Sequence, residues 1–362
     1  MSSLRQIKNR IQSVTTTRQM TASMKIVAVS RLKRTYAELL KTIPFAEEMN
    51  RVVRRLIRSL RLRQENLVWQ NRDKQLNMPP LINGNGKDKR YILVVITSDD
   101  GLSGAASLQL VQQTVKVVDY LLSQQKTVHV FTYGVRGSDV LKRTYPDLPV
   151  IVIKQKKDRV LKGYAHAERI ASDIIESFNR DRFDVCLVIY NQFRSVISQI
   201  PVVEQIIPNQ LFLPNNPWDF LSLRPDTYSE SDPTGRRRMV VKDSVFLQAI
   251  GGADMLPSLQ GAIFKADLNR GKRSPDVYDY EPSDTGILQQ ILPRYLTAYM
   301  HRIILESEVS DNAARLMAMD NATRNAGDML ADLNRTYRRT RQSKITTDIA
   351  EVSTGSIQEN PI

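Results

Sequence analysis

The spacing of apolar residues changes along the chain, and its longest uniform stretch lies near the C-terminus. From Leu288 to Ser353 apolar residues recur every three or four positions, and no proline falls between Pro293 and Pro361. This period is typical of an amphipathic helix. At ~1.5 Å per residue such a helix is roughly 90 Å long, which is more than one compact domain can bury. We therefore expect it to leave its own domain and to lie against a partner helix or inside another protein.

The N-terminal segment has the same helical period. Residues 3–43 contain neither glycine nor proline, and a polar gap at 15–19 weakens the apolar stripe locally. The pattern pauses at Pro44 and resumes to about Leu62, which predicts a kink or a helix restart at the proline. One long helix at each end of the chain favours an antiparallel coiled coil with facing apolar stripes. The C-terminal helix is the longer one, so we expect its tip to project beyond the pair.

Between these helices the period changes to that of an α/β domain. The run 91–97 is continuously apolar and is bounded by turn residues, as in a buried strand. Alternating patterns then predict strands at 127–133, 149–153 and 183–190, helices at 102–123, 135–143 and 164–179, and one more edge strand within 193–207. Strands that alternate with helices predict a largely parallel, Rossmann-like sheet. A further helix is possible within 244–269.

The predicted organisation has three parts. An N-terminal coiled-coil helix occupies 1–62, the α/β domain occupies 63–285, and the C-terminal coiled-coil helix occupies 286–362. The stretches 63–90 and 209–277 are rich in turn-forming and polar residues and are interpreted as loop insertions in the domain.

The charge of the chain points to an acidic partner. The formal net charge is +14 over 362 residues, and residues 1–60 hold thirteen Lys or Arg against three Glu. Such a helix fits nucleic acid or an acidic protein surface. The basic cluster at Lys25 and 31–34 lacks the interleaved aromatics of a nucleic-acid site, with only Tyr36 nearby, so an acidic protein loop is favoured. A basic coiled-coil protein that binds nucleic acid remains the alternative.

Catalytic chemistry finds little support in the sequence. The turn 97–104 lies between a strand and a helix and resembles a phosphate-binding loop, yet the chain lacks both G-x-x-x-x-G-K-[ST] and G-x-G-x-x-G. A tight structural turn is the favoured interpretation, and a nucleotide-binding enzyme is a third hypothesis. The histidines at 129, 166 and 301 stand far apart without metal-ligand spacing. We expect no cofactor and no metal.

Compartment signals are few. The one cysteine, Cys186, lies within an apolar run, so no disulfide can form and a reducing compartment is indicated. No apolar run approaches the ~20 residues of a membrane-spanning helix. The helical pattern begins at once, without an apolar signal region.

Several motifs together resemble one family, the γ subunit of F-type ATP synthase, which is the central rotor shaft. Ser98–Gly104 reads SDDGLSG and resembles the family's S-D-R-G-L-C-G. The other matching segments are Arg18–Arg34 (RQMTASMKIVAVSRLKR), Tyr280-Glu-Pro282, Glu306–Gly327 and Arg341–Thr346. The resemblance covers about 1–60, 91–208 and 278–353.

The resemblance implies a subunit that is not itself catalytic but belongs to the proton-transporting ATPase complex. The two terminal helices would lie inside the hexamer of α and β subunits, and the α/β domain would lie outside it, against the ε subunit and the c ring. Rotation of the ring would turn the shaft and drive the three catalytic sites. The resemblance further implies a peripheral position at the cytoplasmic face of the bacterial plasma membrane, contact with the membrane through the c ring, and no nucleic acid as partner.

Individual roles carry over by position. Met24 and Lys25 match positions that face an acidic loop of β. The C-terminal positions that match contacts with the hexamer are Arg315, Gln342, Thr346 and Asp348. The region that faces the c ring or ε is represented by Tyr278, Tyr280 and Glu281. Near the end of the helix, we expect Ile345, Ile349 and Val352 to touch an apolar sleeve in the hexamer.

The chain departs from the family pattern at several positions within the matching segments. Asp100 and Ser103 replace the usual arginine and cysteine of the loop. Asp320 and Arg324 stand where the family often has a basic and an acidic residue, which predicts a reversed charge pair. No cysteine pair is present, so a thiol switch is excluded.

Overall fold

The computed structural model describes residues 4–69, 79–153, 163–208 and 284–358. The chain divides into two compact units, one formed by Arg31–Ala314 and the other by Met1–Ser30 together with Arg315–Ile362. The second unit consists of the outer parts of two long helices, α1 (Leu4–Trp69) and α8 (Asp284–Gln358). The predicted long terminal helices are thereby confirmed, while the three-part division of the chain stays a prediction.

Helix α1 is longer than its sequence pattern indicated. Pro44 lies inside the helix and does not end it. The predicted loop beginning at residue 63 is wrong for 63–69, which continue the helix. That segment, RQENLVW, includes no glycine or proline, and Arg, Gln, Glu and Leu are good helix formers.

The inner parts of α1 and α8 form an apolar cluster within the first unit. Val53, Leu56 and Ile57 of α1 are buried together with Leu288 and Tyr295 of α8. This packing stabilises α1 and α8 near Pro44 and Pro293, the prolines inside them, since helical stability in proteins comes mainly from the burial of an apolar face.

The sheet of the first unit has five strands in the order β3-β2-β1-β4-β5. Strands β1 (Arg90–Ile96), β2 (Thr127–Tyr133), β3 (Val150–Ile153) and β4 (Val185–Phe193) pair in parallel. Strand β5 (Gln199–Ile207) adds to β4 in the antiparallel sense at the edge. The predicted parallel, Rossmann-like sheet with an extra edge strand is confirmed.

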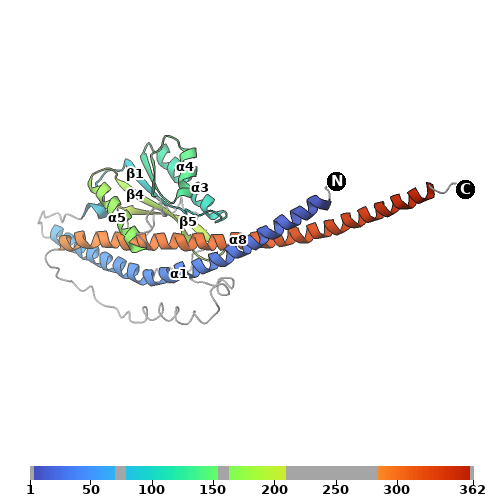
Figure 1. The fold of residues 1–362 in the computed structure, drawn as a ribbon. Coiled ribbons are helices and arrows are strands. Elements are labelled where there is room, and N and C mark those ends of the chain that lie inside the picture. The colour runs from blue at the N-terminus through green and yellow to red at the C-terminus, as the bar shows by residue number, and fades with distance from the viewer. Residues whose placement is uncertain (1–3, 70–78, 154–162, 209–283, 359–362) are drawn as a thin grey trace. The chain divides into compact units, whose positions relative to one another are not determined.

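Helices cover both faces of this sheet (Figure 1). Helices α3 (Ala106–Ser123) and α4 (Val135–Thr144) pack on one face. Helix α5 (Tyr164–Asn179) and the inner part of α8 pack on the other, where Leu296, Met300 and Ile303 enter the core. A short helix, α2 (Pro80–Asn83), precedes the first strand. The inner part of α8 is thus a layer of the α/β domain as well as a partner of α1.

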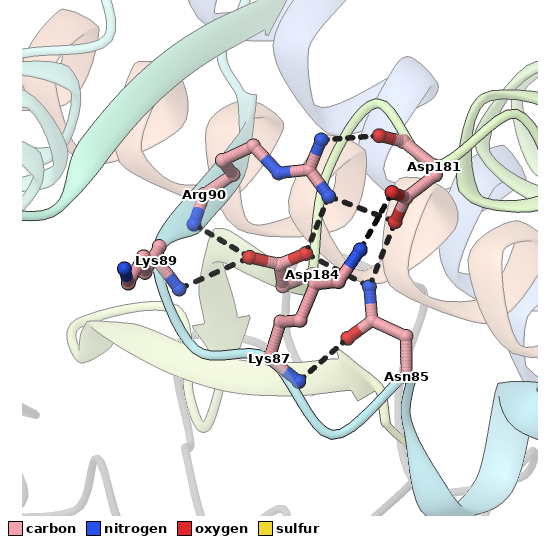
Figure 2. Close-up of polar contacts among 6 residues, drawn as sticks. All are labelled: Asn85, Lys87, Lys89, Arg90, Asp181 and Asp184. Carbon is pink, nitrogen blue, oxygen red and sulfur yellow. Dashed lines mark hydrogen bonds and ion pairs between the residues drawn. The ribbon is translucent and has the colours of Figure 1, made fainter.

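A buried carboxylate holds the amino ends of β1 and β4 together (Figure 2). Asp184 accepts hydrogen bonds from the backbone amides of Lys89 and Arg90 at 3.0 and 2.9 Å, and from the side chains of Asn85 and Arg90 at 2.8 Å each. Burial by itself raises the pKa of Asp184. The hydrogen bonds together lower the pKa by more than burial raises it, so it lies well below its usual range.

A second carboxylate extends this cluster toward the surface. Asp181 forms ion pairs with Lys87 and Arg90, at 2.8 Å each. Hydrogen bonds from Lys87 and Arg90 lower the pKa of Asp181. Both aspartates are therefore ionised near neutral pH, and they fix the start of the two central strands.

Candidate coupling surface on the paired helices

The outer parts of α1 and α8 pair in antiparallel fashion within the second unit. Lys25 Nζ lies 2.6 Å from Asp320 Oδ1, and the hydroxyl of Thr323 lies 2.9 Å from that of Thr21. A Cβ added at Gly327 would lie 3.9 Å from the guanidinium of Arg18. Residue numbers rise on α8 as they fall on α1, which confirms the predicted antiparallel pair.

The sheltered positions of both helices follow coiled-coil spacing. Steps of three and four residues separate them, apart from one step of seven across the polar gap at 15–19, as in a heptad seam. They are Leu4, Ile7, Ile11, Val14, Thr21, Lys25 and Ala28 on α1, and Leu316, Met319, Thr323, Ala326, Leu330, Leu333 and Tyr337 on α8. Most of the seam is apolar, and its polar members are Thr21 and Lys25 on α1 and Thr323 on α8.

A charged layer lies at the level of these polar positions. Asp320 is ion-paired with Lys25 and, at 2.5 Å, with Arg324 on its own helix. The Asp320 side chain is only 14% exposed, while those of Lys25 and Arg324 are 43% and 72% exposed. The hydrogen bond from Lys25 lowers the pKa of Asp320, and the charge of Arg324 adds to this. Two partly exposed cations therefore share one buried carboxylate, which leaves positive charge facing outward.

The face of α1 beside this layer carries apolar side chains that the chain itself leaves exposed. Met20, Met24 and Val27 are 56%, 38% and 51% exposed. Their spacing of four and three residues places them along one side of the helix. An aligned row of exposed apolar side chains is a candidate contact surface for another protein.

The C-terminal tip of α8 extends past the start of α1. In the register set by Lys25 and Asp320, Leu4 lies opposite about residue 341, and every residue from 341 to 352 is exposed. Ile345, Ile349 and Val352 are 45%, 64% and 74% exposed. The tip is thus a helix with an exposed apolar stripe that extends past the described part of α1, as the two helix lengths predicted.

The predicted contact residues differ in exposure. Gln342, Thr346 and Asp348 are exposed on the tip, and the hydroxyl of Thr346 donates to the carbonyl of Gln342 at 2.9 Å. Arg315 is 9% exposed, so most of its side chain is covered by the chain itself. Met24 and Lys25 lie on the outer part of α1, and Lys25 also has the partner described above.

Other predictions fall on segments outside the described residues. These include Tyr278, Tyr280 and Glu281, the insertion 209–277 and the helix expected within 244–269. Their roles stay predictions.

The strand-to-helix turn 97–104 is held by contacts within its unit. Ser98 donates to Asp311 at 2.9 Å, Arg31 to Asp100 at 3.1 Å, and the amide of Val135 to Asp99 at 2.9 Å. Two carboxylates in the turn oppose the binding of a phosphate. The geometry favours the structural interpretation of this turn.

Neither a metal cluster nor a membrane span emerges within the described part of the chain. No group of three or more His, Cys, Asp or Glu side chains there could hold a metal ion. None of the helices traced in the described ranges combines the length and the apolar character needed to cross a bilayer.

Fold and surface together define a protein of two parts, an α/β domain and a pair of long antiparallel helices with exposed apolar side chains. A family model described as ATP synthase matches residues 3–357. The "ATP synthase gamma chain" of Pelagibacter ubique is 31% identical over 98% of this chain and 99% of that protein. The "ATP synthase gamma chain" of Paramagnetospirillum magneticum is 33% identical with the same coverage.

The chain belongs to the ATP synthase gamma chain family. This is the family that the terminal motifs predicted. This assignment replaces the interpretation of the basic N-terminus as a nucleic-acid-binding coiled coil. A solved structure titled as the rotor of the Euglena gracilis mitochondrial ATP synthase aligns with a TM-score of 0.49 and 15% identity, over 94% of this chain and 98% of that one. At that level the likeness is too distant to support a functional statement.

Sequence reasoning missed which residues the long helices hold together. It placed Lys25 against a partner subunit and Asp320 in a pair with Arg324, but not the two against each other. Lys25 falls on a seam position of α1, but Asp320 lies beside the seam of α8 between Met319 and Thr323, so the spacing gave no signal for this pair.

Proposed function

We propose that this chain is the non-catalytic central shaft of a rotary ATP synthase, turning inside the hexamer of α and β subunits. The observation that carries this proposal is the exposed apolar stripe at the tip of α8, formed by Ile345, Ile349 and Val352. An isolated chain gains nothing from such a stripe, whereas a shaft needs a low-polarity surface that can turn within a sleeve.

Coupling follows from the unequal faces of the pair. The charged layer at Lys25 and Asp320, the apolar stripe of Met20, Met24 and Val27, and the exposed tip give the pair a surface that differs from place to place. Three catalytic subunits arranged around such a shaft meet three different surfaces. Each orientation favours one state of each site, so rotation and nucleotide affinity are linked by a coupling free energy.

Specific contacts are assigned by residue. Met24 and Lys25 face an acidic loop of β, and Arg315, Gln342, Thr346 and Asp348 contact the hexamer. The ammonium of Lys25 has three donors and is 43% exposed, so it can bind a second carboxylate while Asp320 holds it. Tyr278, Tyr280 and Glu281 are assigned to the face toward the c ring or ε.

The α/β domain is assigned to the membrane side of the complex, against ε and the c ring. Membrane contact is then indirect, through the c ring, and the subunit is peripheral at the cytoplasmic face of the bacterial plasma membrane. The bacterial origin of the relatives supports this location.

Purification of the complex from native membranes tests the proposal. We expect this chain to copurify with the ATP-hydrolysing complex and to turn when ATP is added to the immobilised hexamer. Its absence from that complex would exclude the role. A variant truncated after residue 340 is expected to assemble, because the seam is intact, but to develop less torque. Unchanged torque would show that the tip is not a bearing surface.

A further inference from the structure

A row of polar side chains on α8 reaches the carboxyl ends of the two central strands. The hydroxyl of Ser310 donates to the carbonyl of Asn191 in β4 at 2.9 Å, and that of Ser307 to the carbonyl of Ile96 in β1 at 3.4 Å. Ser310 is fully buried and Ser307 is 7% exposed. These bonds lie in a low-dielectric interior, where a lost partner is costly.

The turn after β1 continues this row to both long helices. Ser98 donates to Asp311 of α8 at 2.9 Å, and Arg31 of α1 donates to Asp100 at 3.1 Å. Nearby, the ring of Tyr36 in α1 meets that of Phe193 in β4, with centroids 5.8 Å apart. Both long helices therefore contact the carboxyl ends of β1 and β4 or the turn that follows β1.

The turn is fixed to the sheet as well. The amide of Thr97 donates to the carbonyl of Tyr133 at 2.7 Å, and the amide of Gly137 to the hydroxyl of Thr97 at 3.3 Å. A Cβ at Gly134 would lie 2.2 Å from the carbonyl oxygen of Thr97. A force on Asp100 or Ser98 is thus passed directly to β1, β2 and α4.

Farther along α8 the contact with the sheet is mainly apolar, through Leu296, Met300 and Ile303 in the core of the domain. Its directed contacts there reach only the edge strand β5, where Tyr299 donates to Glu204 and Arg302 lies 4.0 Å from the same carboxylate. Apolar packing resists separation, but it is non-directional and opposes rolling or sliding of a helix only through shape. Hydrogen bonds have a preferred distance and angle, so they fix the rotation of the helix about its own axis.

We propose that Ser307, Ser310 and Asp311 are positioning residues that lock α8 against the α/β domain, so that torque passes between domain and shaft without slip. This rests on the proposed shaft function. Asp311 acts through Ser98, and the pair of Arg31 with Asp100 adds the second helix. We call this set, Ser98, Asp100, Arg31, Ser307, Ser310 and Asp311, the torsion bracket.

The torsion bracket is tested in the assembled complex with Ser310→Ala and with Asp311→Asn. A probe is attached to the α/β domain through a Thr144→Cys substitution on the exposed side of α4, and the hexamer is immobilised. The native Cys186 is fully buried, and burial raises the pKa of its thiol to about 12, so labelling is confined to position 144. The readouts are the angular fluctuation of the probe in stalled complexes and the number of ions pumped per ATP.

Ser310→Ala removes a buried hydrogen bond, and Asp311→Asn replaces the charged acceptor of Ser98 with a weaker neutral one. Each change is expected to lower the ratio of seated to unseated domain, about fivefold for the lost buried bond. Both variants should therefore show wider angular fluctuation and fewer ions pumped per ATP, while ATP hydrolysis is retained. Ser123→Ala is the matched control, because that exposed hydroxyl bonds only to Tyr120 of its own helix. It should behave as wild type.

Two results would overturn the inference: fluctuation and pumping unchanged in Ser310→Ala, or changed equally in Ser123→Ala. If Asp311→Asn prevents assembly, Ser310→Ala decides alone, since it changes no charge. Failure of the shaft function itself would appear differently, as a wild-type complex in which this chain does not rotate.

Discussion

Charge reversal at Lys25 can distinguish the roles of its two proposed partners, Asp320 in this chain and an acidic loop of β. The substitution Lys25→Glu would place two carboxylates in the space where Lys25 Nζ and Asp320 Oδ1 now lie 2.6 Å apart. It would therefore open the helix pair as well as repel an acidic loop of β. The triple variant Lys25→Glu, Asp320→Lys, Arg324→Glu restores both ion pairs with opposite signs, and only the charge that faces outward stays reversed.

The expected magnitudes follow from exposure. Two like charges about 4 Å apart repel by ~4 kcal/mol at an effective dielectric constant of about 20. Lys25 is 43% exposed, which screens this repulsion. We expect Lys25→Glu to destabilise the pair by about 2–3 kcal/mol, lost ion pair included, and the triple variant to return within ~1 kcal/mol of wild type.

Native-state hydrogen exchange of amides in residues 4–30 measures the opening of the pair, and ions pumped per ATP in proteoliposomes measure coupling. We expect the triple variant to regain exchange protection but not coupling, because position 25 then faces the β loop with a negative charge. Lys25→Gln is the control for simple loss of charge. Wild-type coupling in the triple variant would refute the assignment of Lys25 to β and leave Asp320 as its functional partner.

Three further outcomes are expected. Asp184→Asn should lower the free energy of unfolding of the α/β domain by about 2–3 kcal/mol at pH 7, measured by urea unfolding, since buried donors lose a charged acceptor. Because the pKa of Asp184 is lower in the folded state, the wild-type advantage exists above the unfolded pKa and shrinks as the pH falls below it; a pH-independent difference would argue against this. Gly134→Ala should cost ~3 kcal/mol or more in the same assay, because φ is +107° and the added Cβ would lie 2.2 Å from a backbone oxygen, and a stable variant would contradict the geometry. Ile349→Ser should leave the stability of the isolated chain within about 0.5 kcal/mol, since Ile349 is 64% exposed, but lower the torque of the complex in rotation assays; equal torque would remove Ile349 from the bearing surface.

Periodicity in the sequence determined the elements of this protein. The steps of three and four residues predicted both long helices, and the apolar runs predicted the strands, with Thr127–Tyr133 and Tyr164–Asn179 matching β2 and α5 to the residue. The error at 63–69 came from judging 63–90 as a whole by its polar and turn-forming residues, although 63–69 themselves contain no glycine or proline and can continue a helix. Local spacing suffices for such features because helix and strand geometry repeats within a few residues.

Tertiary structure alone decided which side chains meet. Lys25 and Asp320 are 295 residues apart and Ser98 and Asp311 are 213 apart, and neither pair can be read from a local pattern. Their contacts depend on the register of the two helices and on the order of the strands. Those are set by the packing of all the apolar faces at once, since burial is non-directional and a polar pair forms only where that packing brings it within hydrogen-bonding distance.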